Sequence, residues 1–192
     1  MKKIILDLCG GTGAWSRPYL EAGYEVHNIT LPKYDVRDFQ LKPTDKIYGI
    51  FAAPPCTMFS IARKNAKTPP DFEKGMEIVL ACLKIIWQAQ LNHPLKFWAL
   101  ENPRGFLRKF LGKPKYTFAQ WEFGGKLSKY TDIWGYFNPP AKKVKIKPTG
   151  IDIDKEWQKP IQPDWIKEKL NRTEIRAITY ESFARAFFRA NQ

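Results

Sequence analysis

The chain has 192 residues, of which 44% are hydrophobic, and its 32 basic against 19 acidic residues leave a net charge of +13. The length indicates one domain with a proper core, and the basic excess favours nucleic acid as a partner over mere solubility. The three cysteines lack CxxC spacing and the two histidines lack partner spacing, which argues against a disulfide framework and a metal site. The apolar runs are too short for a signal peptide or a membrane span. We therefore expect a soluble, cytoplasmic protein.

Strand-like and helical patterns alternate over the first half of the chain. The patterns predict strands at 3–8, 24–31, 47–53 and 97–102 and helices at 16–23, 72–92 and 104–112. Such alternation indicates an α/β fold in which helices cover both faces of a mostly parallel sheet. Ligands of such sheets bind beyond the carboxyl ends of the strands.

The second half is less regular. Residues 137–150 are rich in proline and lysine and begin a segment of low periodicity that runs to about residue 171. Residues 173–192 then predict a turn into a helix with Thr179 as a candidate N-cap. The aromatic residues of 115–123 either pack in the core or line a nucleic-acid cleft.

The first candidate site follows the first predicted strand, where residues 6–16 read LDLCGGTGAWS. Its glycines allow a sharp turn and close approach to a ligand. The spacing is not GxGxxG, which weakens the case for a dinucleotide site, and the absence of a Lys-Ser/Thr pair argues against a phosphate-binding P-loop. A glycine turn preceded by Asp7 suits a cofactor that carries a ribose and a charged amino-acid tail. A plain tight turn between strand and helix is the alternative.

The second candidate is Cys56, which directly follows two prolines at the end of an apolar run, IFAAPPCTMFS. A cysteine at a strand exit near a helix N-terminus is expected to have a lowered pKa and to act as a nucleophile. The alternative is an inert, half-buried thiol.

The third candidate is Glu101 in WALENPRG, where a strand ends before a proline turn. A carboxylate there can bind or protonate a ring nitrogen, especially if burial raises its pKa, and the alternative is an acid that merely ends the strand. A parallel sheet would bring all three candidates to one cleft.

Together these motifs resemble the cytosine-5 DNA methyltransferase family. The family's Asp-Leu-Phe-Cys-Gly-Ala-Gly-Gly-Phe-Ser aligns with residues 7–16 without a gap, and its Pro-Pro-Cys matches residues 54–56. Glu101 and Asn102 match its Glu-Asn-Val, and residues 176–188 resemble its Arg-Pro-Leu-Thr-x-x-Glu-x-Ala-Arg-Leu segment.

The resemblance implies a Rossmann-like class I methyltransferase fold and S-adenosylmethionine as cofactor. The reaction would be methyl transfer to carbon 5 of cytosine in DNA. Cys56 would form a covalent adduct at carbon 6 of a flipped-out base, and Glu101 would hold ring nitrogen 3 and the exocyclic amine. Residues 1–137 would be the catalytic domain, 138–172 a reduced target-recognition segment and 173–192 a helix returning to the catalytic domain. The implied cofactor-binding residues are Asp7, Leu8, Cys9, Gly10, Gly11, Thr12, Gly13, Trp15, Asn28, Thr30, Asp35 and Pro54, with Asp38 as the alternative to Asp35.

Several positions depart from the family pattern. Cys9 replaces the family's aromatic residue, so an adenine contact would pass to Trp15 or be lost. Asn28 and Thr30 stand where an acid usually meets the ribose. The Gln-x-Arg-x-Arg motif is absent, and Lys129 and Thr131 occupy its place, so we assign a site role to Lys129.

The recognition segment 138–172 leaves little room for a base-reading surface, which predicts a short recognition site, weak specificity or help from a partner. RNA or a nucleotide as substrate stays open, because basic charge does not distinguish DNA from RNA. A degenerate fold that only binds nucleic acid is the non-enzyme alternative. Retention of both Cys56 and Glu101 opposes that alternative.

Overall fold

The protein folds around one six-stranded mixed sheet. The structure is a computed structural model that describes residues 2–61, 67–147 and 162–192. The strand order is β2-β1-β3-β4-β6-β5, and among these strands β6 alone runs against the other five. The α/β class and the mostly parallel sheet expected from the sequence are confirmed. The strands are β1 (Ile4–Leu8), β2 (Glu25–Ile29), β3 (Ile47–Ala52), β4 (Phe97–Pro103), β5 (Tyr116–Ala119) and β6 (Tyr130–Tyr136).

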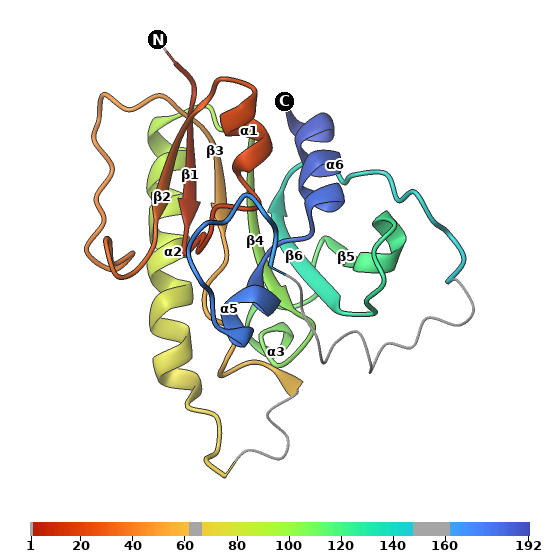
Figure 1. Cartoon of the computed structure of the whole chain (residues 1–192). Coiled ribbons are helices and arrows are strands. Elements are labelled where there is room, and N and C mark those ends of the chain that lie inside the picture. Colours follow the sequence, from red (N-terminus) through yellow and green to blue (C-terminus); the bar gives the residue numbers. More distant parts are fainter. Residues whose placement is uncertain (1, 62–66, 148–161) are drawn as a thin grey trace.

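Helices cover both faces of the sheet (Figure 1). One face packs against α2 (Phe72–Asn92), and the other packs against α1 (Arg17–Glu21) and α6 (Glu181–Asn191). Strand β1 shows the alternation that builds both layers, because Leu6 and Leu8 join the core under α2 while Ile5 joins the core under α1 and α6. Asp7 shares the Ile5 side, so its carboxyl lies on the α1 and α6 face.

Helix α2 spans the predicted residues 72–92. The Asp71 side chain caps it by accepting a hydrogen bond of 3.0 Å from the backbone N–H of Lys74. Val79, Cys82 and Ile86 recur at helical spacing and are fully buried, which places Cys82 in the core as predicted.

The predicted helix at 104–112 is wrong for its first half, since only α3 (Arg108–Leu111) is helical. The Phe106 N–H donates 2.8 Å to the Phe59 carbonyl, and a Cβ on Gly105 would lie only 2.2 Å from that oxygen. A long-range contact with the loop after β3 therefore holds residues 104–107 out of the helix.

The C-terminal region also differs from the sequence expectation. It forms two helices, α5 (Arg172–Ala177) and α6, and Thr179 is not the N-cap of either. Asn171 caps α5 through hydrogen bonds to the N–H groups of Thr173 and Glu174, and Tyr180 precedes α6 without a side-chain cap. Ile178 and Tyr180 have extended backbone, and residues 178–180 line a cavity beside α6.

The aromatic residues of 115–123 belong mainly to the core. They form β5 and the short 3-10 helix η2 (Gln120–Phe123), and Phe118 stacks on Phe183 of α6 with ring centroids 3.8 Å apart. No helix in the described ranges is long and apolar enough to cross a bilayer. Within the same residues, no group of three or more His, Cys, Asp or Glu side chains could hold a metal ion. Of the predicted recognition segment, residues 148–161 lie outside the described residues.

Candidate active site

A cavity of about 660 Å³ lies at the carboxyl ends of β1, β3 and β4. Residues from the segment 165–170 and from α5 form its opposite wall, and Figure 1 shows α5 beside this edge of the sheet. The cavity brings together ten of the residues predicted from the sequence, namely Asp7, Cys9, Gly10, Gly11, Thr12, Trp15, Pro54, Cys56, Glu101 and Lys129.

The glycine turn forms one end of this cavity. Its backbone takes positive φ at Cys9 (57°), Gly11 (54°) and Gly13 (73°), which is unusual for the non-glycine residue Cys9. Gly10 is required for a different reason, because a Cβ there would lie 2.3 Å from the carboxyl carbon of Asp7. The turn therefore closes directly over the Asp7 side chain.

Asp7 is a buried carboxyl with one committed and one uncommitted oxygen. The Ser16 hydroxyl donates a 2.5 Å hydrogen bond to Oδ2, whereas Oδ1 is buried and has no hydrogen-bond partner among the described residues. Burial raises the pKa of Asp7 to about 6, although the hydrogen bond from Ser16 opposes this shift. An uncommitted acceptor in a cavity wall is a favourable contact for a ligand that carries N–H or O–H groups.

Several other predicted cofactor contacts lie elsewhere. Asn28 and Thr30 hold the glycine turn instead of lining the cavity: the Asn28 amide donates 2.9 Å to the Gly11 carbonyl, and the Thr30 hydroxyl accepts 3.3 Å from the Gly11 N–H. Leu8 is buried in the core beneath α2, and Gly13 does not line the cavity.

Asp35 was predicted to meet the cofactor's adenine, but its carboxylate is engaged by Arg37. The Arg37 Nε lies 3.0 Å from Oδ1, and this contact lowers the pKa of Asp35 to about 2. Asp38, the alternative, is exposed and does not line the cavity. Leu31 and Pro32 form the cavity wall in this part of the chain.

Cys56 sits in a tight turn after β3. Its carbonyl accepts hydrogen bonds from the N–H groups of Phe59 (3.0 Å) and Ser60 (2.9 Å). The buried Asn102 amide at the end of β4 donates 2.9 Å to the carbonyl of Pro54, two residues before the cysteine. The proline pair, this hydrogen bond and the turn together fix the backbone that presents the thiol.

The charges around Cys56 differ from the sequence expectation. Burial raises the pKa of the Cys56 thiol instead of lowering it. The positive charges of Lys129 and Arg176 oppose this rise, while Glu101 adds to it. The prediction of a lowered pKa is wrong for the protein without a ligand, because desolvation outweighs the nearby cations.

Glu101 lines the same cavity, and burial raises the pKa of its carboxyl. Lys129 opposes the rise, and the buried Asp132 reinforces it. The Lys129 Nζ is fixed by a 3.1 Å hydrogen bond to the Arg176 carbonyl. A thiol, a readily protonated carboxyl and an ammonium group thus share one wall of the cavity.

Sequence reasoning did not assign site roles to Trp165, Arg176 and Thr179. Trp165 and Thr179 line the cavity, and Arg176 acts on Cys56 through its charge. Arg176 and Thr179 lie in the terminal stretch that resembles the family, which was the available signal for them. Trp165 lies within the segment of low periodicity and carried no such signal.

No protein-family model matches the chain, and no curated protein sequence matches it significantly. The candidate function therefore depends on the geometry of this cavity and on the motif resemblance.

Proposed function

We propose that the protein is an S-adenosylmethionine-dependent methyltransferase that acts on carbon 5 of cytosine in DNA. The observation that carries the proposal is that the Cys56 thiol, Glu101 and Lys129 line one cavity with the glycine turn. These residues are far apart in sequence, and a binding protein has no need for a cysteine and an acid at these positions.

The glycine end of the cavity fits the cofactor. Asp7 offers a buried acceptor at Oδ1, and the buried Trp15 offers an indole N–H that has no acceptor among the described residues. Cys9, Gly10, Gly11 and Thr12 bring backbone to the cavity surface, where Leu31 and Pro32 add apolar contact. S-adenosylmethionine, when bound, supplies an electrophilic methyl group.

Cys56 would act as the nucleophile. Its thiolate adds to carbon 6 of the base as nitrogen 3 takes a proton from Glu101, which makes carbon 5 electron-rich. Carbon 5 would then take the methyl group, whose bond to the cofactor's sulfur breaks to leave S-adenosylhomocysteine, and the proton on carbon 5 leaves to water. The bond from sulfur to carbon 6 then breaks, which regenerates the Cys56 thiolate, and nitrogen 3 returns its proton to Glu101.

The pKa shifts suit these roles in different ways. The raised pKa of Glu101 favours the protonated carboxyl that the addition step needs. The raised pKa of Cys56 leaves the free enzyme with less thiolate at neutral pH than an ordinary cysteine has, so Lys129 and Arg176 are needed to favour the ionised form. We therefore expect the rate of attack to rise as the pH approaches the pKa of the thiol.

The test is direct. The purified protein is incubated with S-adenosylmethionine and unmethylated duplex DNA, and the digested nucleosides are identified by mass spectrometry. We expect 5-methylcytosine with the wild type and none with Cys56→Ser, although the variant still binds S-adenosylhomocysteine. DNA that contains 5-fluorocytosine should trap a covalent complex with the wild type alone, because fluorine cannot leave carbon 5 as a proton does.

Other outcomes would reassign the function. A base methylated on its amino group would show that Cys56 is not the nucleophile. Methylation of RNA but not of DNA would make RNA the substrate. Nucleic-acid binding without any methylated product would favour a protein that only binds.

A further inference from the structure

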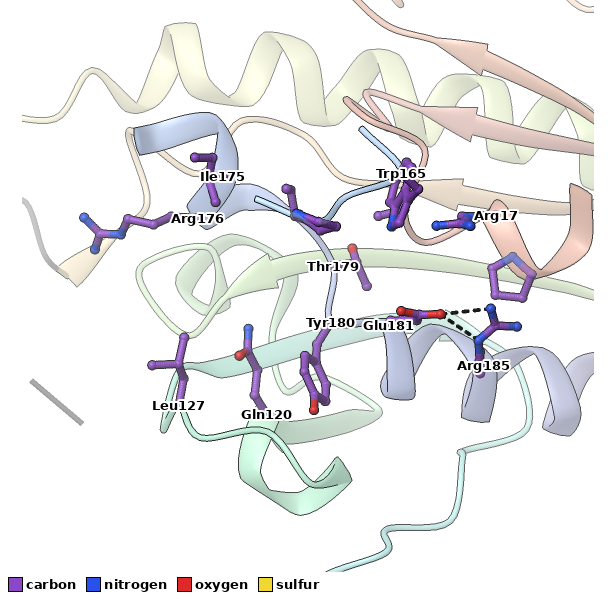
Figure 2. Close-up of a pocket in the computed structure, with 14 residues that line it drawn as sticks. Arg17, Gln120, Leu127, Trp165, Ile175, Arg176, Thr179, Tyr180, Glu181 and Arg185 are labelled. Atoms are coloured by element: carbon purple, nitrogen blue, oxygen red, sulfur yellow. Dashed lines mark hydrogen bonds and ion pairs between the residues drawn. The ribbon is translucent and has the colours of Figure 1, made fainter. Parts of the chain in front are cut away.

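A second cavity, of about 290 Å³, adjoins the first. The two cavities share Ala14, Trp165, Ile178 and Thr179 as lining residues, so the second continues from the glycine turn. Figure 2 shows this cavity, with Arg17 beside Trp165 and the ion pair between Arg185 and Glu181 of α6. Nothing in the proposed methyl transfer so far uses these side chains.

Arg17 is held in place but is only partly satisfied. Its Nε lies 2.8 Å from Glu21, and its guanidinium lies over the Trp165 ring, 4.2 Å from the ring centroid. Its Nη1 atom is buried and has no hydrogen-bond acceptor among the described residues. A buried N–H without an acceptor is costly, so a ligand acceptor at this point would be favoured.

Three arginines lie around the second cavity. Arg17, Arg176 and Arg185 line it. Glu181 and Glu21 neutralise two of these positive charges, since Glu21 pairs with both Arg17 and Arg185 (2.9 Å to Arg185). The rest of the wall is largely apolar, which suits a small organic anion better than a fully hydrated one.

We propose that Arg17, stacked on Trp165, binds the carboxylate of the amino-acid tail of S-adenosylmethionine. This inference rests on the proposed function. The tail is a zwitterion, and the two adjoining cavities offer the matching groups. Asp7 lines the first cavity, and its unpartnered Oδ1 can accept from the ammonium group; Arg17 lines the second, and its unpartnered Nη1 can donate to the carboxylate. The glycine turn lies between them in the chain.

The proposal also gives a role to the segment that follows residue 161. Trp165 lies more than a hundred residues from Arg17 in the chain, yet it covers the guanidinium and lines both cavities. By stacking on Arg17 it excludes water from the carboxylate site, and a partly desolvated charge pair is stronger than an exposed one. Part of the predicted recognition segment would thus serve the cofactor.

Two ligands separate the tail from the rest of the cofactor. S-adenosylhomocysteine carries the amino-acid tail, and 5′-methylthioadenosine has the same nucleoside and sulfur without it. Their dissociation constants are measured by calorimetry for the wild type and for Arg17→Gln. We expect Arg17→Gln to weaken S-adenosylhomocysteine roughly 10- to 100-fold, as expected for loss of a charge-assisted pair, with no change for 5′-methylthioadenosine.

The controls distinguish the possible failures. Arg189→Gln, an exposed arginine of α6, should change neither constant. Arg17→Lys keeps the charge without the planar fork and should give an intermediate loss. If Arg17→Gln weakens both ligands alike, or neither, the carboxylate role of Arg17 is overturned while the cofactor site stands. If neither ligand binds the wild type, the proposed cofactor itself is overturned, and this inference with it.

Discussion

Asp7 illustrates, at the scale of one residue, how a buried carboxylate costs stability. Its pKa of about 6 lies above the value of 3.8 that an exposed aspartate has, because burial disfavours the carboxylate. The folded protein therefore binds more protons than the unfolded chain in this interval. The contribution of Asp7 to the free energy of unfolding is complete below the pKa that the group has in the unfolded chain. It is lost as the pH rises through the higher pKa of the folded protein.

We expect Asp7→Asn to stabilise the protein at pH 7.5 and to abolish cofactor binding. The shift of the pKa corresponds to about 3 kcal/mol at most, so a gain of about 1–3 kcal/mol in the free energy of unfolding is expected, and it should shrink towards pH 4.5. Urea unfolding at the two pH values measures it. Asp38→Asn, at an exposed aspartate, should show no such gain. A loss of stability at pH 7.5 would contradict this account of Asp7.

At the scale of elements, the site depends on contacts between loops that follow different strands. The Asn102 amide at the end of β4 donates a hydrogen bond to the Pro54 carbonyl, and the Phe106 N–H donates one to the Phe59 carbonyl. The loop that carries Cys56 is therefore fixed on both sides of the cysteine by the segment after β4. The proposed role of Cys56 as a nucleophile requires the thiol to be held within a fraction of an ångström, so we expect these links to affect turnover more than stability.

We expect Asn102→Ala to lower turnover roughly 10- to 100-fold, because the loop loses the hydrogen bond that positions it. The cost in the free energy of unfolding should be only about 1–2 kcal/mol, and the affinity for DNA should not change. Asn92→Ala is a matched control, since the Asn92 amide also donates 2.9 Å to a backbone carbonyl, but at the exposed end of α2. Equal losses of turnover in the two variants would contradict a positioning role for Asn102.

At the scale of the whole molecule, the net charge of +13 is the clearest property that concerns the substrate. Lys129 and Lys167 line the cavity and would contact a polyanion that binds there. Such contacts release counterions from the nucleic acid, so binding through them must weaken as salt is added. Lys84 lies on the exposed side of α2, across the sheet from α1 and α6, and should take no part.

We expect the logarithm of the affinity for duplex DNA to fall linearly with the logarithm of salt concentration, with a slope of about −0.9 for each phosphate contacted. Lys167→Gln should make the slope shallower by about one such contact, whereas Lys84→Gln should leave it unchanged. Fluorescence anisotropy with labelled duplex over a salt series measures the slopes. An affinity that does not depend on salt concentration would contradict the expectation that basic side chains bind DNA through its phosphates.

The local patterns of the sequence determined the elements and the parts of the site that depend on near neighbours. The helix 72–92 was predicted at its observed bounds because its apolar residues recur at a spacing that is set by near neighbours in the chain. The strands before Asp7, Cys56 and Glu101 were predictable for the same reason, and a parallel sheet places their ends at one edge.

Only the tertiary structure decided which side chains the cavity receives and what state they are in. Gly105 lies outside the predicted helix because the Phe59 backbone packs against it. The Asp35 carboxylate accepts a hydrogen bond from Arg37 instead of lining the cavity. Burial raises the pKa of Cys56, whereas the motif predicted a lowered pKa. Arg17 and Trp165 meet although nothing in the chain links their positions. Desolvation and contacts between distant segments are set by packing in three dimensions, and a periodic pattern along the chain contains no record of them.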